Sequence, residues 1–168
     1  MNLDYCIAQL TVNAAALQAL AAGIGAEQAR WKPTPESWSM LEVVNHLADE
    51  EREDFRPFLE HTLAGMRKPP HDPAEWIATR GYNQRDLTAS IADFMQEREK
   101  SLAWLRGLAG ADWETPLPEG WWPGFRAGNI LASWVAHDVL HQRQLVELKF
   151  AYTRNALAPY NVEYAGEW

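Results

Sequence analysis

Apolar residues recur at intervals of three and four positions along four long stretches of the chain, the spacing that lines one face of an α-helix. This pattern predicts helices over about residues 3–22, 39–63, 86–108 and 127–152. Glycines follow the first three stretches at Gly23, Gly65 and Gly110, and glycine is common just beyond a helix C-terminus. The chain is therefore predicted to be all-α.

Two local sequence features help to define the second predicted helix, one at its start and one inside it. Ser39 and Glu42 have the spacing of a capping box, in which a hydroxyl and a carboxylate bond the free amides at the start of a helix. Pro57 lies inside the same stretch and lacks the N–H that a helical residue donates. It is therefore predicted to kink this helix.

Segments rich in proline and glycine separate the predicted helices. Residues 68–86 are predicted to form a long crossover loop with a short helical turn near Trp76, and a second long loop precedes the last helix. Residues 156–168 are predicted to be irregular. Four helices with such connections predict a four-helix bundle with long crossover connections, in one domain that spans residues 1–168.

Charge and composition narrow the range of partners. The formal net charge is −8, and an acidic chain repels phosphate backbones, so no nucleic-acid partner is expected. The chain has no apolar run of about 18 residues, so no membrane partner is expected. The lone cysteine, Cys6, excludes an intrachain disulfide, and the N-terminus lacks the charge pattern of a signal peptide. These features favour a cytoplasmic protein.

Three histidines form a candidate metal site. His137 and His141 are four residues apart in the last predicted helix, so their side chains face the same side of it. His46 adjoins the apolar face of the second predicted helix and supplies a third imidazole. Three neutral imidazoles suit one divalent ion, with zinc first and nickel, iron, cobalt or manganese as alternatives. Three protein ligands leave a coordination position open, as in catalytic zinc sites.

The alternative for these histidines is a structural role that involves no metal. A histidine pair at this spacing is a weak signal by itself, because surface and hydrogen-bonded core histidines also show it. His61 and His71 lie near a helix end and in a proline-rich loop, where no chemistry is indicated. Asp138 directly follows His137, whereas the zincin proteases have glutamate at that position, so a protease of that class is not expected.

Further side chains are candidates for the surroundings of the metal. Glu50 is four residues after His46, and Gln144 shares a helix face with His137. Together with Arg143, these residues are predicted to orient a ligand or to contact a substrate. No residue is assigned a catalytic role.

Tryptophans and the cysteine have simpler interpretations. Trp38 and Trp134 are predicted to pack around the site, because an indole brings a large apolar area. Trp121 and Trp122 precede the last helix and either roof a substrate pocket or anchor their loop. Cys6 is predicted to be a small hydrophobic core residue rather than a nucleophile.

Three segments together resemble a known family. Residues 36–51 (ESWSMLEVVNHLADEE) and 134–145 (WVAHDVLHQRQL) are similar to two signatures of the DinB-like superfamily, and residues 80–83 (RGYN) resemble its connection between the second and third helices. The resemblance covers most of the chain in order and spacing. It implies a four-helix bundle in which His46, His137 and His141 bind one divalent metal ion.

The resemblance also implies a function. Characterised relatives include transferases and isomerases that use a low-molecular-weight thiol such as bacillithiol or mycothiol, and members are often dimers. We therefore expect a metal-dependent S-transferase that activates such a thiol to attack a small electrophile, with a homodimer as its expected assembly. The alternatives are a non-enzymatic metal-binding bundle of the stress response and a metal-dependent hydrolase.

Overall fold

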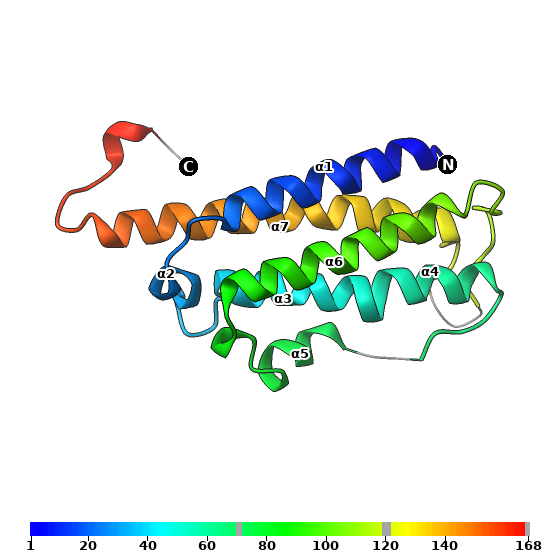
Figure 1. Ribbon diagram of the computed structural model, residues 1–168, viewed down its shortest axis with the longest axis horizontal. Helices are drawn as coiled ribbons and strands as arrows, with labels where there is room; N and C mark the ends of the chain where they lie inside the picture. The colour runs from blue at the N-terminus through cyan, green and yellow to red at the C-terminus, as the bar shows by residue number, and fades with distance from the viewer. Residues whose placement is uncertain (70–71, 119–121, 167–168) are drawn as a thin grey trace.

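The computed structural model describes residues 1–69, 72–118 and 122–166, and these residues form four long helical columns without a β-strand (Figure 1). The columns are α1 (Leu3–Ala21), the continuous run of α3 (Met40–Asp49), η1 (Glu50–Phe55) and α4 (Arg56–Leu63), then α6 (Leu87–Arg106) and α7 (Ala127–Ala156). Shorter elements are α2 (Ala26–Arg30), α5 (Pro73–Thr79), η2 (Tyr82–Gln84) and η3 (Glu163–Ala165). The prediction of an all-α protein is confirmed.

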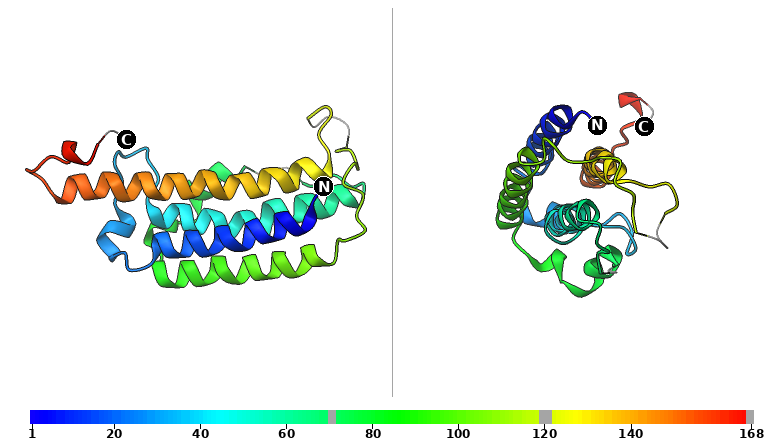
Figure 2. Two further views of the ribbon diagram at one scale, coloured as in Figure 1. Left: turned by 90° about the horizontal axis from the view of Figure 1, so that it is seen from above. Right: turned by 90° about the vertical axis from the view of Figure 1, so that its right-hand side faces the viewer.

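The columns pack as a bundle with one long crossover. α1 contacts α7 on one side and α6 on the other, while the α3–α4 column contacts both α6 and α7 (Figure 2). α1 and α7 run in one direction and the other two columns in the opposite direction. The segment that contains α5 returns the chain along the bundle between α4 and α6, whereas the connection from α6 to α7 stays at one end. The predicted four-helix bundle is therefore confirmed.

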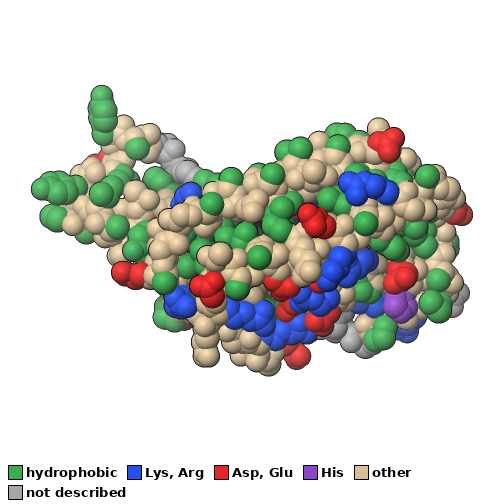
Figure 3. Space-filling view, viewed as in Figure 1, with side chains coloured by type: hydrophobic (Ala, Val, Ile, Leu, Met, Phe, Trp, Pro, Cys, Tyr) green, Lys and Arg blue, Asp and Glu red, His purple; other side chains and the backbone are tan. Residues whose placement is uncertain are grey.

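The crossover segment is attached to the bundle by ion pairs. Arg80 donates to the carboxylates of Asp49 and Glu53 at 2.6 and 2.7 Å, and its guanidinium stacks on the ring of Trp76. The Tyr82 hydroxyl also donates to Asp49. The predicted helical turn near Trp76 is α5. Figure 3 shows the acidic and basic side chains gathered together on this face of the molecule.

Two apolar clusters fill the described part of the bundle, one toward each end. The first includes Ala14, Val44, Phe94 and Leu145, and the second includes Leu10, Leu59, Leu102, Leu131 and Trp134. On three of the columns, buried polar residues come between the members of the two clusters: Asn13 on α1, Arg98 on α6, and Asp138 and His141 on α7. On the α3–α4 column, Glu50 and Glu51 separate α3 from Leu59 in the same way. A buried polar belt therefore crosses the middle of the bundle.

Most helix boundaries agree with the predicted ones. The capping box is present, because the Ser39 hydroxyl accepts from the Glu42 amide at 3.1 Å and the Glu42 carboxylate accepts from the Ser39 amide at 2.7 Å. The last helix reaches Ala156, four residues beyond its predicted end. The five-residue helix α2 was not predicted, since it is too short to show an apolar periodicity.

The second column contains a π-helical turn, η1, just before Pro57, the residue at which the sequence predicts a kink. Proline donates no hydrogen bond and its ring crowds the preceding turn, so a wider turn just before Pro57 relieves both problems. Such π-bulges are frequent at functional sites. Here the turn carries Glu50 and Glu51, which belong to the buried belt, and Phe55, which contacts His137.

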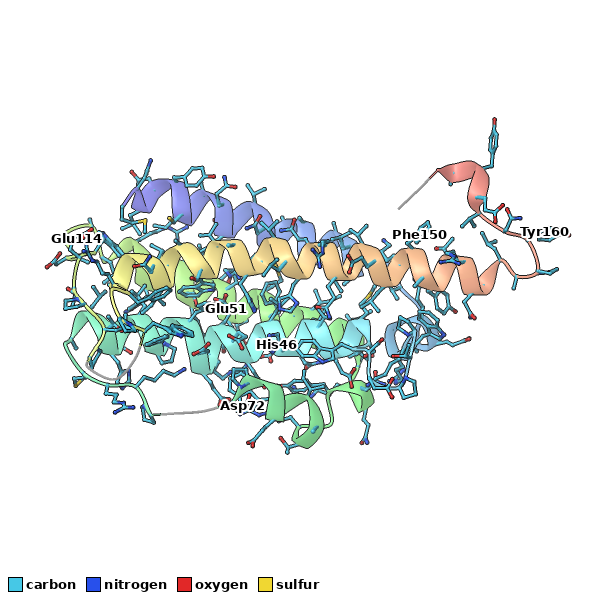
Figure 4. All side chains as sticks on the ribbon, turned by 180° about the vertical axis from the view of Figure 1, so that it is seen from behind. His46, Glu51, Asp72, Glu114, Phe150 and Tyr160 are labelled. Atoms are coloured by element: carbon cyan, nitrogen blue, oxygen red, sulfur yellow. The ribbon has the colours of Figure 1, made fainter. Side chains whose placement is uncertain are left out.

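The end of the chain leaves the bundle. Beyond Ala156 the chain turns back in a short arm that contains η3 and is otherwise irregular, as predicted (Figure 1). Tyr160 and Tyr164 of this arm are largely exposed, and Figure 4 shows Tyr160 at its tip. In the described residues, no helix has the length and apolar character needed to span a membrane.

Candidate metal centre

Three histidines from two columns converge in the polar belt. His46 comes from α3, and His137 and His141 come from successive turns of α7. One ring nitrogen of each lies within 4.8 Å of the other two, and the Nε2 atoms of His137 and His141 are 3.1 Å apart. Figure 4 shows His46 in the interior, on the side of its column that faces α7. The structure thus brings together the three histidines that the sequence singled out.

The environment keeps these imidazoles neutral. Burial lowers the pKa of His46 to about 2 and that of His137 to about 3, and the neighbouring imidazoles contribute to both shifts. Burial also lowers the pKa of His141, while the hydrogen bond to Gln144 opposes that shift. Neutral imidazoles have a free lone pair for a metal ion, and without an ion three of them in contact leave polar atoms poorly satisfied.

The geometry of the cluster fits a divalent ion. In the described part of the chain, the buried His46 Nδ1 has no hydrogen-bond partner. Zinc–nitrogen bonds of about 2.1 Å at a tetrahedral ion place two ligand nitrogens about 3.4 Å apart, close to the separation between His137 and His141. His137 and His141 therefore already have the spacing of two ligands, and His46, whose ring nitrogen lies within 4.8 Å of theirs, would supply the third and leave at least one coordination position open.

Two of the three predicted surrounding residues reach the cluster. The Gln144 carbonyl oxygen lies 2.8 Å from Nδ1 of His141, so it accepts a hydrogen bond there and directs the Nε2 lone pair toward the other histidines. Glu50 Oε1 lies 3.6 Å from Nε2 of His46. Arg143 does not reach the site: it is 73 % exposed and pairs with Glu147 on the outer face of α7.

Glu50 is an unusual carboxyl group. It is buried next to other acidic side chains, and burial followed by repulsion from Asp54 raises the pKa of Glu50 to about 9. Lys68, which is also buried and bonded to Asp54, acts in the opposite direction. Like Lys68, a cation at the histidines would stabilise the ionised form of Glu50 and so lower its pKa.

Aromatic rings enclose the cluster. Trp38 packs against His46 and His141 with ring centroids 4.9 and 6.2 Å apart, respectively. Phe55 contacts His137 at 5.1 Å and stacks on Trp134 at 5.5 Å. The predicted packing of both tryptophans around the site is confirmed, and these apolar walls restrict water around the imidazoles.

The predictions for the remaining aromatic and histidine residues have mixed outcomes. Trp122 lines a cavity together with Phe125, whereas Trp121 and His71 lie outside the described residues. His61 bonds the Pro57 carbonyl and takes no part in the cluster. Cys6 is buried in an apolar cluster, as expected for a core residue, and burial raises the pKa of its thiol.

A buried ion network beside the cluster was not predicted. Arg98 is 1 % exposed and donates to Glu51 at 2.7 Å, to Asp138 at 2.7 Å and to the backbone carbonyl of Leu10. The indole N–H of Trp134 also donates to Glu51 at 2.6 Å. One signal could have revealed this network: Arg98 lies midway between Phe94 and Leu102 in the apolar stripe of its helix.

Comparison with known proteins identifies the family. A model of the DinB superfamily matches residues 9–145, a span that includes all three histidines. The chain belongs to the DinB superfamily. Among curated protein sequences, none matches it.

A solved structure shares the fold of this DinB-superfamily chain. YfiT from Bacillus subtilis, described as "a probable metal-dependent hydrolase with an unusual four-helix bundle topology", is similar with a TM-score of 0.77 and 21 % sequence identity. The alignment covers 90 % of this chain and 87 % of YfiT. At this identity, the likeness shows that the two proteins share their fold.

Proposed function

We propose that this DinB-superfamily protein is a divalent-metal-dependent enzyme that activates a low-molecular-weight thiol, such as bacillithiol, to attack a small electrophile. The observation that carries the proposal is the cluster of His46, His137 and His141, three neutral imidazoles with an unsatisfied buried nitrogen. Zinc is the first candidate, since the donor set contains only nitrogen. The resemblance of two sequence segments to thiol-using relatives supports the choice of thiol transfer.

Each residue of the site has a distinct role in this proposal. His46, His137 and His141 hold the metal, and Gln144 keeps His141 in the tautomer whose Nε2 is free. When bound, the metal supplies Lewis acidity that favours the deprotonated form of a thiol or of water at neutral pH. Glu50 Oε1, 3.6 Å from Nε2 of His46, would orient that imidazole so that its unpartnered Nδ1 is free for the metal. Trp38 and Phe55 keep bulk water away from the imidazoles.

A second candidate is hydrolysis, and one observation favours it. Three protein ligands leave a coordination position open for a water molecule, and a divalent metal there would favour its deprotonation at neutral pH. YfiT, which has the same fold, carries the description of a metal-dependent hydrolase. Hydrolysis and thiol transfer would use the same open metal position, so the substrate alone distinguishes them.

Metal content is the first test. We expect about one zinc or nickel ion per chain in the wild type by elemental analysis, as for a single site with three protein ligands. His141→Ala should lose most of this metal, because two imidazoles hold an ion much less firmly. His61→Ala removes a histidine outside the cluster and should keep its metal. A wild type that stays metal-free after exposure to zinc and nickel would contradict the proposal.

The dependence on a thiol is the second test. The metal-loaded protein would be assayed with 1-chloro-2,4-dinitrobenzene in the presence and absence of bacillithiol or cysteine, and with p-nitrophenyl acetate alone. Turnover that needs both the thiol and the metal supports S-transfer, and thiol-independent ester cleavage supports hydrolysis. If both substrates remain unchanged although the metal binds, a non-enzymatic metal-binding bundle becomes the better account of the site. His141→Ala is the matched control for all assays.

A further inference from the structure

An apolar cavity lies next to the histidine cluster. It has a volume of about 550 Å³, within the range of about 300–1,000 Å³ typical of small-molecule sites. Three parts of the fold supply its lining: the turn from η1 into α4, the segment before α7, and the first turns of α7. The lining residues are Asp54, Phe55, Phe58, Trp122, Phe125, Ile130 and Ser133.

The cavity and the metal centre share a wall. One lining residue, Phe55, also contacts the ring of His137, with centroids 5.1 Å apart. Another lining residue, Ser133, precedes His137 by four positions on α7 and so lies on the same helix face, one turn or about 6 Å away. A molecule in this cavity would therefore lie within a helical turn of the cluster.

The walls select for a flat apolar group. Four of the seven lining side chains are aromatic, and Trp122 and Phe125 form a tilted pair with centroids 5.3 Å apart. Trp122 is 65 % exposed, although an indole is usually covered. A planar ligand could stack against these rings and bury the indole.

The polar atoms of the lining restrict the charge of the ligand. Among the described lining residues none is cationic, and the one acidic residue, Asp54, is paired with the Lys68 ammonium, so the lining presents no uncompensated charge. The chain as a whole has a formal net charge of −8, so an anionic group would be repelled. The Ser133 hydroxyl offers a neutral hydrogen-bond partner at the edge of the cavity. The lining therefore favours an uncharged aromatic ligand over an aromatic acid or a phosphate ester.

We propose that this cavity is the binding site for the substrate attacked at the metal centre, and that this substrate carries an uncharged aromatic group. The assignment of the bound molecule as a substrate rests on the proposed function. The cavity, its aromatic walls and its preference for a neutral ring are properties of the apoprotein. They can therefore be tested without a metal and without turnover.

The test uses N-phenyl-1-naphthylamine, an uncharged aromatic probe whose fluorescence rises in an apolar site. We expect saturable binding to the wild type. Ser133→Phe fills the cavity from an exposed helix position and should weaken binding at least tenfold. Ala132→Phe adds the same side chain at the neighbouring exposed position, outside the lining, and should bind the probe like the wild type. Trp122→Ala removes one wall and should weaken binding severalfold.

Three outcomes would overturn the inference. These are no saturable binding to the wild type, equal binding to Ser133→Phe, and equal weakening by Ala132→Phe. Metal content, measured on the same preparations, separates this inference from the proposed function. If the metal binds and the probe does not, only the cavity assignment is contradicted. If the probe binds a protein that takes up no metal, only the proposed function is contradicted.

A second measurement tests the shared wall. Cobalt quenches a nearby fluorophore, whereas zinc does not, so cobalt-loaded protein should give a dimmer bound probe than zinc-loaded protein. Equal fluorescence in the two forms would place the probe away from the histidines and overturn the inference.

Discussion

At the residue scale, the site depends on how each buried polar atom finds a partner. Gln144 bonds His141, whereas His46 Nδ1 lacks a hydrogen-bond partner among the described residues. An unpaired buried polar atom costs free energy, and a metal ion would remove that cost. The sequence predicted Gln144 because it shares a helix face with the histidine pair. Arg143 lies on the outer face of α7 instead, because residues two positions apart on a helix do not face each other.

Replacing Gln144 tests this support of the metal ligand. Gln144→Leu keeps the size of the side chain but removes the oxygen bonded to His141 Nδ1, so the imidazole loses its preferred tautomer. We expect zinc affinity to fall by about 10–100-fold, the usual effect of losing such a partner. Competition with a fluorescent zinc chelator measures this change. Arg143→Leu is the control and should bind zinc like the wild type, and an equal loss in both variants would contradict the role of Gln144.

At the element scale, local chemistry decides where the ligand-bearing helices begin and how they turn. The capping box at Ser39 was predictable from four consecutive residues, because both of its hydrogen bonds are local. The Ser39 hydroxyl also contacts the Asn83 side chain at 2.6 Å, which ties η2 to the start of α3. The π-turn η1 was not predicted, because a widened turn depends on the whole column and not on Pro57 alone.

Removing the cap tests its contribution to the helix that carries His46. Ser39→Ala leaves the Glu42 amide without its side-chain acceptor, which costs about 0.5–2 kcal/mol of unfolding free energy. Urea denaturation followed by circular dichroism measures the loss. Ser37→Ala removes a hydroxyl that bonds Thr34 outside the long helices, and it should change stability by less than about 0.5 kcal/mol. Equal stabilities of the two variants would contradict the cap.

At the scale of the whole molecule, the polar belt joins all four columns between two apolar clusters. Arg98 on α6 bonds Glu51 on η1, Asp138 on α7 and the Leu10 carbonyl on α1. Glu51 and Asp138 are the chain neighbours of Glu50 and His137. The hydrogen bonds of Arg98 that hold the helices together therefore also fix the position of the site. An Arg between two carboxylates satisfies charges that would be very costly to bury alone.

Arg98 therefore has a larger effect on stability than an exposed arginine. Arg98→Met leaves two buried carboxylates without their partner, and we expect a loss of about 3–5 kcal/mol of unfolding free energy. Arg143→Met breaks an exposed pair with Glu147 and should cost at most about 1 kcal/mol. Chemical denaturation of both variants provides the comparison. If Arg98→Met were as stable as Arg143→Met, the network would not hold the bundle together.

The sequence by itself determined the features that depend on neighbours in the chain. Helical periodicity, the cap at Ser39, the facing pair His137 and His141, and the contact from Gln144 all follow from spacings within a few residues. The tertiary structure decided which distant side chains meet. The approach of His46 to the pair on α7, the network of Arg98 and the aromatic cavity depend on how the columns are ordered and rotated against one another. Those rotations are set by packing over the whole bundle, which no local spacing encodes.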